Sequence, residues 1–141
     1  MDAKTTMLAP VMALVLWTFV MWLWMYATRI PAIMKAKMAM DPMAPRGEQM
    51  NLLPANVRWK ADNYNHLFEM PTLFYATGLV LAVLGDTSAA TLNLAWAYVG
   101  LRVVHSLFQA TVNKIEVRFG LFVLSSLVLL ALAIRTALQV F

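Results

Sequence analysis

Residues 58–74 read Arg-Trp-Lys-Ala-Asp-Asn-Tyr-Asn-His-Leu-Phe-Glu-Met-Pro-Thr-Leu-Phe, and this stretch decides the fold. Its polar residues recur at steps of three or four, at positions 58, 62, 66 and 69, so they share one face of a helix. Residues 70–84 then form an uncharged run that ends at Gly85. The pattern predicts a membrane helix whose first third is polar and whose last part is apolar.

A second polar stripe with the same spacing follows the turn at Gly85-Asp86-Thr87-Ser88: Arg102, His105, Gln109 and Asn113. A hairpin places the two stripes at matching depths. It pairs Glu69 with Arg102, His66 with His105, Asp62 with Gln109, and Arg58 with Asn113. Charges are costly at membrane depth, so these stripes are the first place to look for a functional site.

The composition indicates a membrane protein. The chain has 141 residues, of which 62% are hydrophobic and 13% charged, whereas a soluble domain carries about 25% charged residues. Its apolar runs reach the roughly 20 residues needed to cross a bilayer. The net charge is +4, but the basic residues flank apolar spans, which favours membrane topology over nucleic-acid binding. The absence of cysteine excludes disulfides, thiolate metal sites and a cysteine nucleophile.

The fold class expected is all-α, a polytopic membrane protein with a single four-helix domain over residues 1–141. Spans are expected at about 5–28, 57–84, 89–113 and 117–138, with a polar loop over 29–56 that has room for a short interfacial helix. Pro71 is expected to kink the second helix and free the carbonyl of Leu67. Basic residues gather in the first and third connections, which predicts an integral multi-pass protein with both termini non-cytoplasmic, in the inner membrane if the source is bacterial.

Several chemical readings of the stripes remain open. Glu69 and Arg102 suit either a structural ion pair or a ligand anchor. His66 and His105 could ligate zinc or iron with a carboxylate, but they lack a tight local ligand motif, so no metal site is predicted. The methionines at 34, 38, 40 and 43 are read as flexible packing residues rather than copper ligands.

Basic residues gather at the cytoplasmic helix ends. Arg58, Lys60 and Arg118 are read either as topology signals or as an anion funnel, in which arginine suits bidentate carboxylate contacts. Arg118 stands at a helix start, beside backbone donors that favour an anion or a thiolate.

Residues 58–74, followed by Tyr98-Val-Gly-Leu-Arg102-Val-Val-His105, resemble the MAPEG family, the membrane-associated proteins of eicosanoid and glutathione metabolism. The resemblance covers most of the chain. It implies a left-handed four-helix bundle assembled as a homotrimer. It also implies that glutathione binds in clefts between subunits, open to the cytoplasmic side, where an arginine stabilises the thiolate.

The resemblance assigns roles to particular positions. Glu69 matches the glutamate of the second helix, Arg102 matches the arginine of the third, and Arg118 is the candidate catalytic residue. Asp62 departs from the family, which has an arginine seven residues before the glutamate. An acidic residue there would repel a glutathione carboxylate unless a nearby cation compensates. The cofactor-binding residues expected are Arg58, Lys60, Asn65, His66, Glu69, Arg102, His105 and Gln109, with Asn65 or His66 in the place of a family asparagine and Gln109 in the place of a tyrosine.

The function that the resemblance implies is a membrane transferase or peroxidase that uses glutathione or a related thiol on lipophilic electrophiles. The partners expected are the lipid bilayer, a lipophilic small molecule and two further copies of the chain, and no nucleic acid. A non-catalytic lipid-binding or partner-presenting protein on the same scaffold is the alternative, and Asp62 fits it. A transporter that uses the His-Asp-Glu stripe has less support, since no internal repeat is evident.

Overall fold

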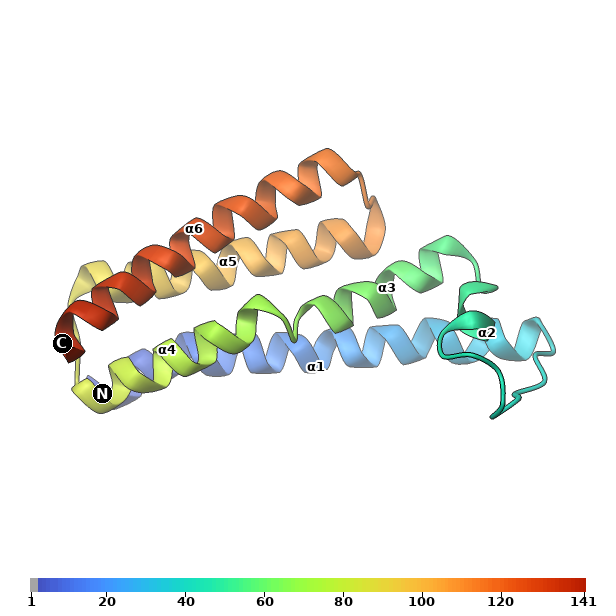
Figure 1. Ribbon diagram of the computed structural model, residues 1–141, viewed down its shortest axis with the longest axis horizontal. Coiled ribbons are helices and arrows are strands. Elements are labelled where there is room, and N and C mark those ends of the chain that lie inside the picture. Colours follow the sequence, from blue (N-terminus) through green and yellow to red (C-terminus); the bar gives the residue numbers. More distant parts are fainter. Residues whose placement is uncertain (1–2) are drawn as a thin grey trace.

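The computed structural model describes residues 3–141, and within them the chain is helical with no strands. Its helices are α1 (Ala3–Lys35), α2 (Glu48–Asn51), α3 (Ala55–His66), α4 (Met70–Leu84), α5 (Ala89–Thr111) and α6 (Ile115–Val140). Figure 1 shows α3 and α4 returning along α1, and α5 and α6 forming a second antiparallel pair. Both chain ends lie at the same end of the bundle as the turn between α4 and α5, and α2 lies at the other end.

Among the described residues, three stretches are long and apolar enough to cross a membrane: Thr6–Lys35, Ala55–Leu84 and Ile115–Val140. Large apolar side chains are exposed along all of them, as expected of surfaces that face lipid. The protein is therefore a multi-pass membrane protein. The helix α5 has 23 residues but is not in this set, and it carries the second polar stripe.

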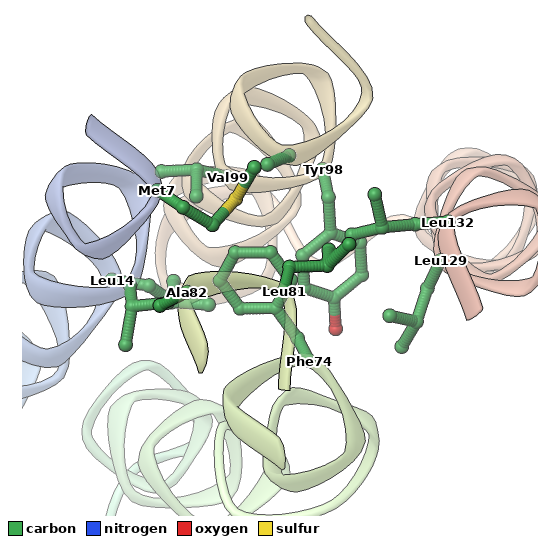
Figure 2. Close-up of a cluster of buried hydrophobic side chains, with 11 residues drawn as sticks. Met7, Leu14, Phe74, Leu81, Ala82, Tyr98, Val99, Leu129 and Leu132 are labelled. Carbon is green, nitrogen blue, oxygen red and sulfur yellow. The ribbon is translucent and has the colours of Figure 1, made fainter. Parts of the chain in front are cut away.

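The apolar core lies in the half of the bundle that holds the termini, where all four long helical segments meet (Figure 2). Leu14 of α1, Phe74 and Leu81 of α4, Tyr98 of α5 and Leu132 of α6 are completely buried there. The rings of Phe74 and Tyr98 have centroids 4.7 Å apart. The space between the four helices at this end is therefore filled by side chains.

Gly78 sets how closely α4 approaches α1. The residue is buried, and a Cβ atom added to it would lie 2.5 Å from Cγ2 of Val11. That distance is too short for two carbon atoms in contact, so only glycine fits the present spacing of the two helices.

The second predicted helix is broken completely, not kinked. The helix α3 ends at His66, residues Leu67 to Glu69 form a turn, and α4 begins at Met70 with Pro71 in its first turn. Proline has no N–H to donate and its ring excludes a helical carbonyl four residues earlier. Together α3 and α4 still form one candidate span, Ala55–Leu84, but a break replaces the expected kink, with Pro71 as the expected cause.

The first predicted loop is also shorter than expected. The helix α1 continues past Arg29 and Pro31 to Lys35, and α2 adds a helical turn within 29–56. Pro31 removes one backbone donor, but the alanine, methionine and lysine that follow favour a helix. The side-chain amide of Gln49 holds the remaining loop, since its Nε2 donates to the Ala39 carbonyl at 2.8 Å.

The turn between α4 and α5 is tied to the C-terminal end of α6. Asp86 Oδ2 accepts hydrogen bonds from Thr91 Oγ1 at 2.8 Å and from Gln139 Nε2 at 2.7 Å, and its Oδ1 accepts one from the N–H of Ser88 at 2.7 Å. Burial raises the pKa of the Asp86 carboxyl, but the hydrogen bonds from Gln139, Ser88 and Thr91 outweigh it and hold this pKa well below its usual range. Gly85 ends α4 with a positive φ of 72°, as its position after the apolar run predicts.

Candidate functional site

A polar pocket of about 320 Å³ opens beside the break between α3 and α4. It is lined by Asp62, His66, Glu69, Gln109 and Arg118. Three helices and the break contribute, because α5 supplies Gln109 and α6 supplies Arg118. The structure thus brings together four of the predicted site residues and Asp62, the residue that departs from the family.

A second pocket, of about 230 Å³, adjoins the first and shares His66 and Arg118 with it. Its other lining residues are His105, Ile115, Phe119 and Phe122. We call it the aromatic pocket, and the first the polar pocket. Sequence reasoning missed its α6 wall, although the steps of three and four between 115, 118 or 119, and 122 place these side chains on one helical face with Arg118.

Arg118 is held in place by the turn that precedes its helix. Its Nη1 donates to Oδ1 of Asn113 at 2.7 Å. Asn113 adopts a left-handed conformation with φ of 53°, which asparagine tolerates better than most residues, and its N–H donates to the Phe108 carbonyl at 2.8 Å. Arg118 is half-buried and lines both pockets. The hydrogen bond to Asn113 fixes its guanidinium there.

Glu69 makes a hydrogen bond with His66 and none with Arg102. His66 Nδ1 and Glu69 Oε2 are 2.5 Å apart, and the Glu69 side chain is 63% exposed. The expected pairing of Glu69 with Arg102 is therefore not made within the chain. The facing of His66 and His105 is confirmed, since their ring centroids are 5.2 Å apart, and Phe122 packs on the other side of His66 at 5.5 Å.

Arg102 lies behind the two pockets. It is fully buried, its Nη2 donates to the His66 carbonyl at 3.4 Å, and its Nε and Nη1 have no partner among the described residues. The break explains the one contact, because the carbonyl of His66 is at the end of α3.

Other buried polar atoms lie before and after Arg102 along α5. Tyr98 Oη, His105 Nδ1 and Gln109 Oε1 are also buried without a hydrogen-bond partner within residues 3–141. Buried polar atoms normally find partners. His105 and Gln109 line the pockets, so ligand atoms there could satisfy them.

Lys60 lines neither pocket. Its Nζ donates to the carbonyls of Asn56 at 2.8 Å and Ala110 at 3.2 Å, and it lies 5.1 Å from the ring centroid of Trp24. The lysine is 8% exposed and stabilises the C-terminal end of α5. The ammonium already has two backbone partners inside the bundle, and its expected contact with a ligand carboxylate stays a prediction.

Arg58 and Asn65 line neither pocket. Asn65 is exposed and Arg58 is half-buried. No group of three or more His, Asp or Glu side chains is placed to hold a metal ion in the part of the chain that the structure describes. The Arg118 guanidinium lies between the polar pocket and the aromatic pocket.

The comparisons with known proteins agree with this architecture. A family model described as the MAPEG family matches residues 7–138, which is nearly the whole chain. Searches of curated proteins and of solved structures gave no match.

Proposed function

The chain belongs to the MAPEG family, and on that premise we propose that it is a membrane transferase or peroxidase that uses a thiol, glutathione or a related compound, on lipophilic electrophiles. The observation that carries the proposal is the position of Arg118, which lines both the polar and the aromatic pocket. A polar thiol compound in one pocket and an apolar acceptor in the other would meet at this guanidinium.

Arg118 suits the stabilisation of a thiolate. A fixed positive charge lowers the pKa of a bound thiol and donates hydrogen bonds to the sulfur. In a conjugation the sulfur forms a bond to the electrophilic carbon, the leaving group departs with its electron pair, and the thiol proton passes to water. Asn113 would keep the guanidinium at the junction while the reactants exchange.

The polar pocket fits part of a glutathione molecule. The carboxylates of Asp62 and Glu69 and the unpartnered Oε1 of Gln109 are acceptors for an amino group. The pocket's one permanently charged cation is Arg118, whereas glutathione carries two carboxylates. The thiol and amino ends therefore fit the residues present, and the carboxylates do not.

We further propose that α5 is a fourth span and that the protein assembles as a homotrimer with both termini away from the cytoplasm, in the inner membrane if the source is bacterial. The helix α5 measures about 34 Å at 1.5 Å per residue, enough to cross a hydrocarbon core of about 30 Å. The segment from the C-terminal end of α1 to α2, which holds the basic residues Lys35, Lys37 and Arg46, lies at the end of the bundle opposite the termini (Figure 1).

A non-catalytic lipid-binding protein is the second candidate. A separate apolar hollow of about 170 Å³ lies between α1 and the α3–α4 region, lined by Val15, Thr18, Phe19, Trp22, Tyr64, Phe68 and Tyr75. It could hold an acyl or aromatic group without any chemistry, and Asp62 in the polar pocket fits a protein that has lost glutathione.

The test is a conjugation assay on the purified protein in detergent, with glutathione and 1-chloro-2,4-dinitrobenzene. Arg118→Ala should lower kcat/KM by roughly 100-fold or more, the usual loss when a group that stabilises reaction charge is removed. Arg135→Ala, which removes an exposed arginine from the same helix outside both pockets, is the matched control and should stay within about twofold of wild type. Background rates in all three proteins, with glutathione and with other thiols, would refute the enzyme and favour the lipid-binding protein.

A further inference from the structure

The polar pocket carries more negative charge than a glutathione site needs. Two of its five lining residues, Asp62 and Glu69, are carboxylates, and Arg118 is its one permanent cation. Glu69 is paired with His66, and Asp62 has no ion pair or hydrogen bond within residues 3–141. Arg118 also has to serve the sulfur if the proposed function holds, so no cation of the pocket is left for a ligand carboxylate.

Gln109 gives independent evidence for the kind of ligand. Its side chain is 5% exposed and lines the same pocket, and its Oε1 has no partner among the described residues. A buried carbonyl oxygen without a donor costs stability, so the ligand that best suits this pocket brings N–H groups. Asp62, Glu69 and Gln109 together present acceptors from two helices and the break between them.

We propose that the thiol this protein uses carries an ammonium group where glutathione carries its glycine carboxylate. This inference rests on the proposed function, and it names the thiol's chemical class: an amino-terminated thiol, such as a thiol peptide joined to an amine. An ammonium offers three donors to the acceptors of the pocket. A carboxylate at the same position would meet Asp62, a like charge without an ion pair or hydrogen bond within residues 3–141.

The lysine and arginine that could have neutralised Asp62 from the chain itself are placed elsewhere. Lys60 is bound to two backbone carbonyls inside the bundle, and Arg58 does not line the pocket. The negative charge at position 62 is therefore part of what the ligand encounters.

Three thiols that differ at one position test the inference: glutathione, its neutral glycine propylamide, and its glycine amide with 1,3-diaminopropane. Each is titrated against the purified protein, with melting temperature as the binding readout and with the rate of conjugation to 1-chloro-2,4-dinitrobenzene as the second. We expect KM to fall by about fivefold from glutathione to the neutral amide and by about fivefold again to the ammonium amide, the upper range for partly exposed charge pairs.

Variants at position 62 test whether Asp62 causes the preference among the three thiols. Asp62→Asn should remove most of the difference between the three thiols, and Asp62→Arg should reverse their order. Asp41→Asn removes the same charge from an exposed loop far from the pocket and should leave the order unchanged. Equal or better use of glutathione by wild type, or an order that Asp62→Arg leaves unchanged, would overturn the inference while the enzyme stands. Failure of all three thiols in both readouts would instead count against the proposed function.

Discussion

Gly78→Ala should separate α1 from α4 and destabilise the bundle. The added Cβ would lie 2.5 Å from Cγ2 of Val11, about 1 Å closer than two carbon atoms approach in ordinary contact. Valine is stiff about χ1, so its methyl group cannot simply rotate away. The helices must move apart instead, at the place where α1 and α4 share the core with α5 and α6.

The expected magnitude is the difference between two opposed effects. Overpacking of a filled core costs about 1–3 kcal/mol, and replacing glycine by alanine within a helix returns about 0.5–1 kcal/mol. We therefore expect Gly78→Ala to lower the free energy of unfolding by about 1 kcal/mol, within limits of about 0 and 2.5 kcal/mol. Gly120→Ala is the matched control, because a Cβ there has no atom within 4 Å, and it should leave stability unchanged or raise it slightly.

Equilibrium unfolding in mixed detergent and denaturant micelles measures these differences. A double-mutant cycle with Val11→Ala isolates the clash, since truncating the valine makes room for the new methyl group. Gly78→Ala should cost about 1 kcal/mol less in the Val11→Ala background than in wild type. If Gly78→Ala and Gly120→Ala proved equally stable, or if the cycle showed no coupling, the close approach of α1 and α4 would be refuted.

Three further changes test other parts of the structure. Lys60→Met should lower the free energy of unfolding by about 1–3 kcal/mol, the cost of leaving a buried carbonyl without its donor; the unfolding assay above measures it, and an unchanged stability would contradict the contact with Ala110. Asn113→Asp keeps an acceptor for Arg118 but adds a charge beside it, so the pH–rate profile of conjugation should shift to higher pH, whereas an unshifted profile would mean that Asn113 does not influence the thiolate. Asp86 has a folded pKa below its unfolded value near 3.8, so its contribution is present above about pH 4 and is lost as the pH falls below it. The stability difference between wild type and Asp86→Asn should therefore shrink between pH 6 and pH 3, and a difference independent of pH would contradict the network at this turn.

The facing of His66 and His105 could be predicted, although the pairing of Glu69 with Arg102 is not made, because helical spacing and a short turn fix which residues lie at the same depth. The ring contact between His66 and His105 follows from that geometry alone. The family resemblance is confirmed by the match over residues 7–138. Pro71 likewise predicted an interruption of the second helix, because its missing N–H and its ring disturb the helical turn directly before it.

The remaining features depend on contacts between distant segments. Lys60 contacts the Ala110 carbonyl and the Trp24 ring. The spacing of residues along α3 does not predict either partner. The hydrogen bond from Arg102 of α5 to the His66 carbonyl also joins distant segments. The spacing of the α6 residues that line the aromatic pocket shows that they share one helical face. It does not show that this face packs toward His66.

The break at Leu67–Glu69 also has an evolutionary consequence. It divides one membrane crossing into α4, whose buried residues belong to the core, and α3, where Asp62 lines the pocket without an ion pair or hydrogen bond within residues 3–141. A mutation on α3 can therefore change which ligand is recognised without a loss of fold, while drift in α4 is constrained. Descendants of one ancestral bundle could diverge in ligand by single substitutions on α3, each neutral for stability at the moment it arises.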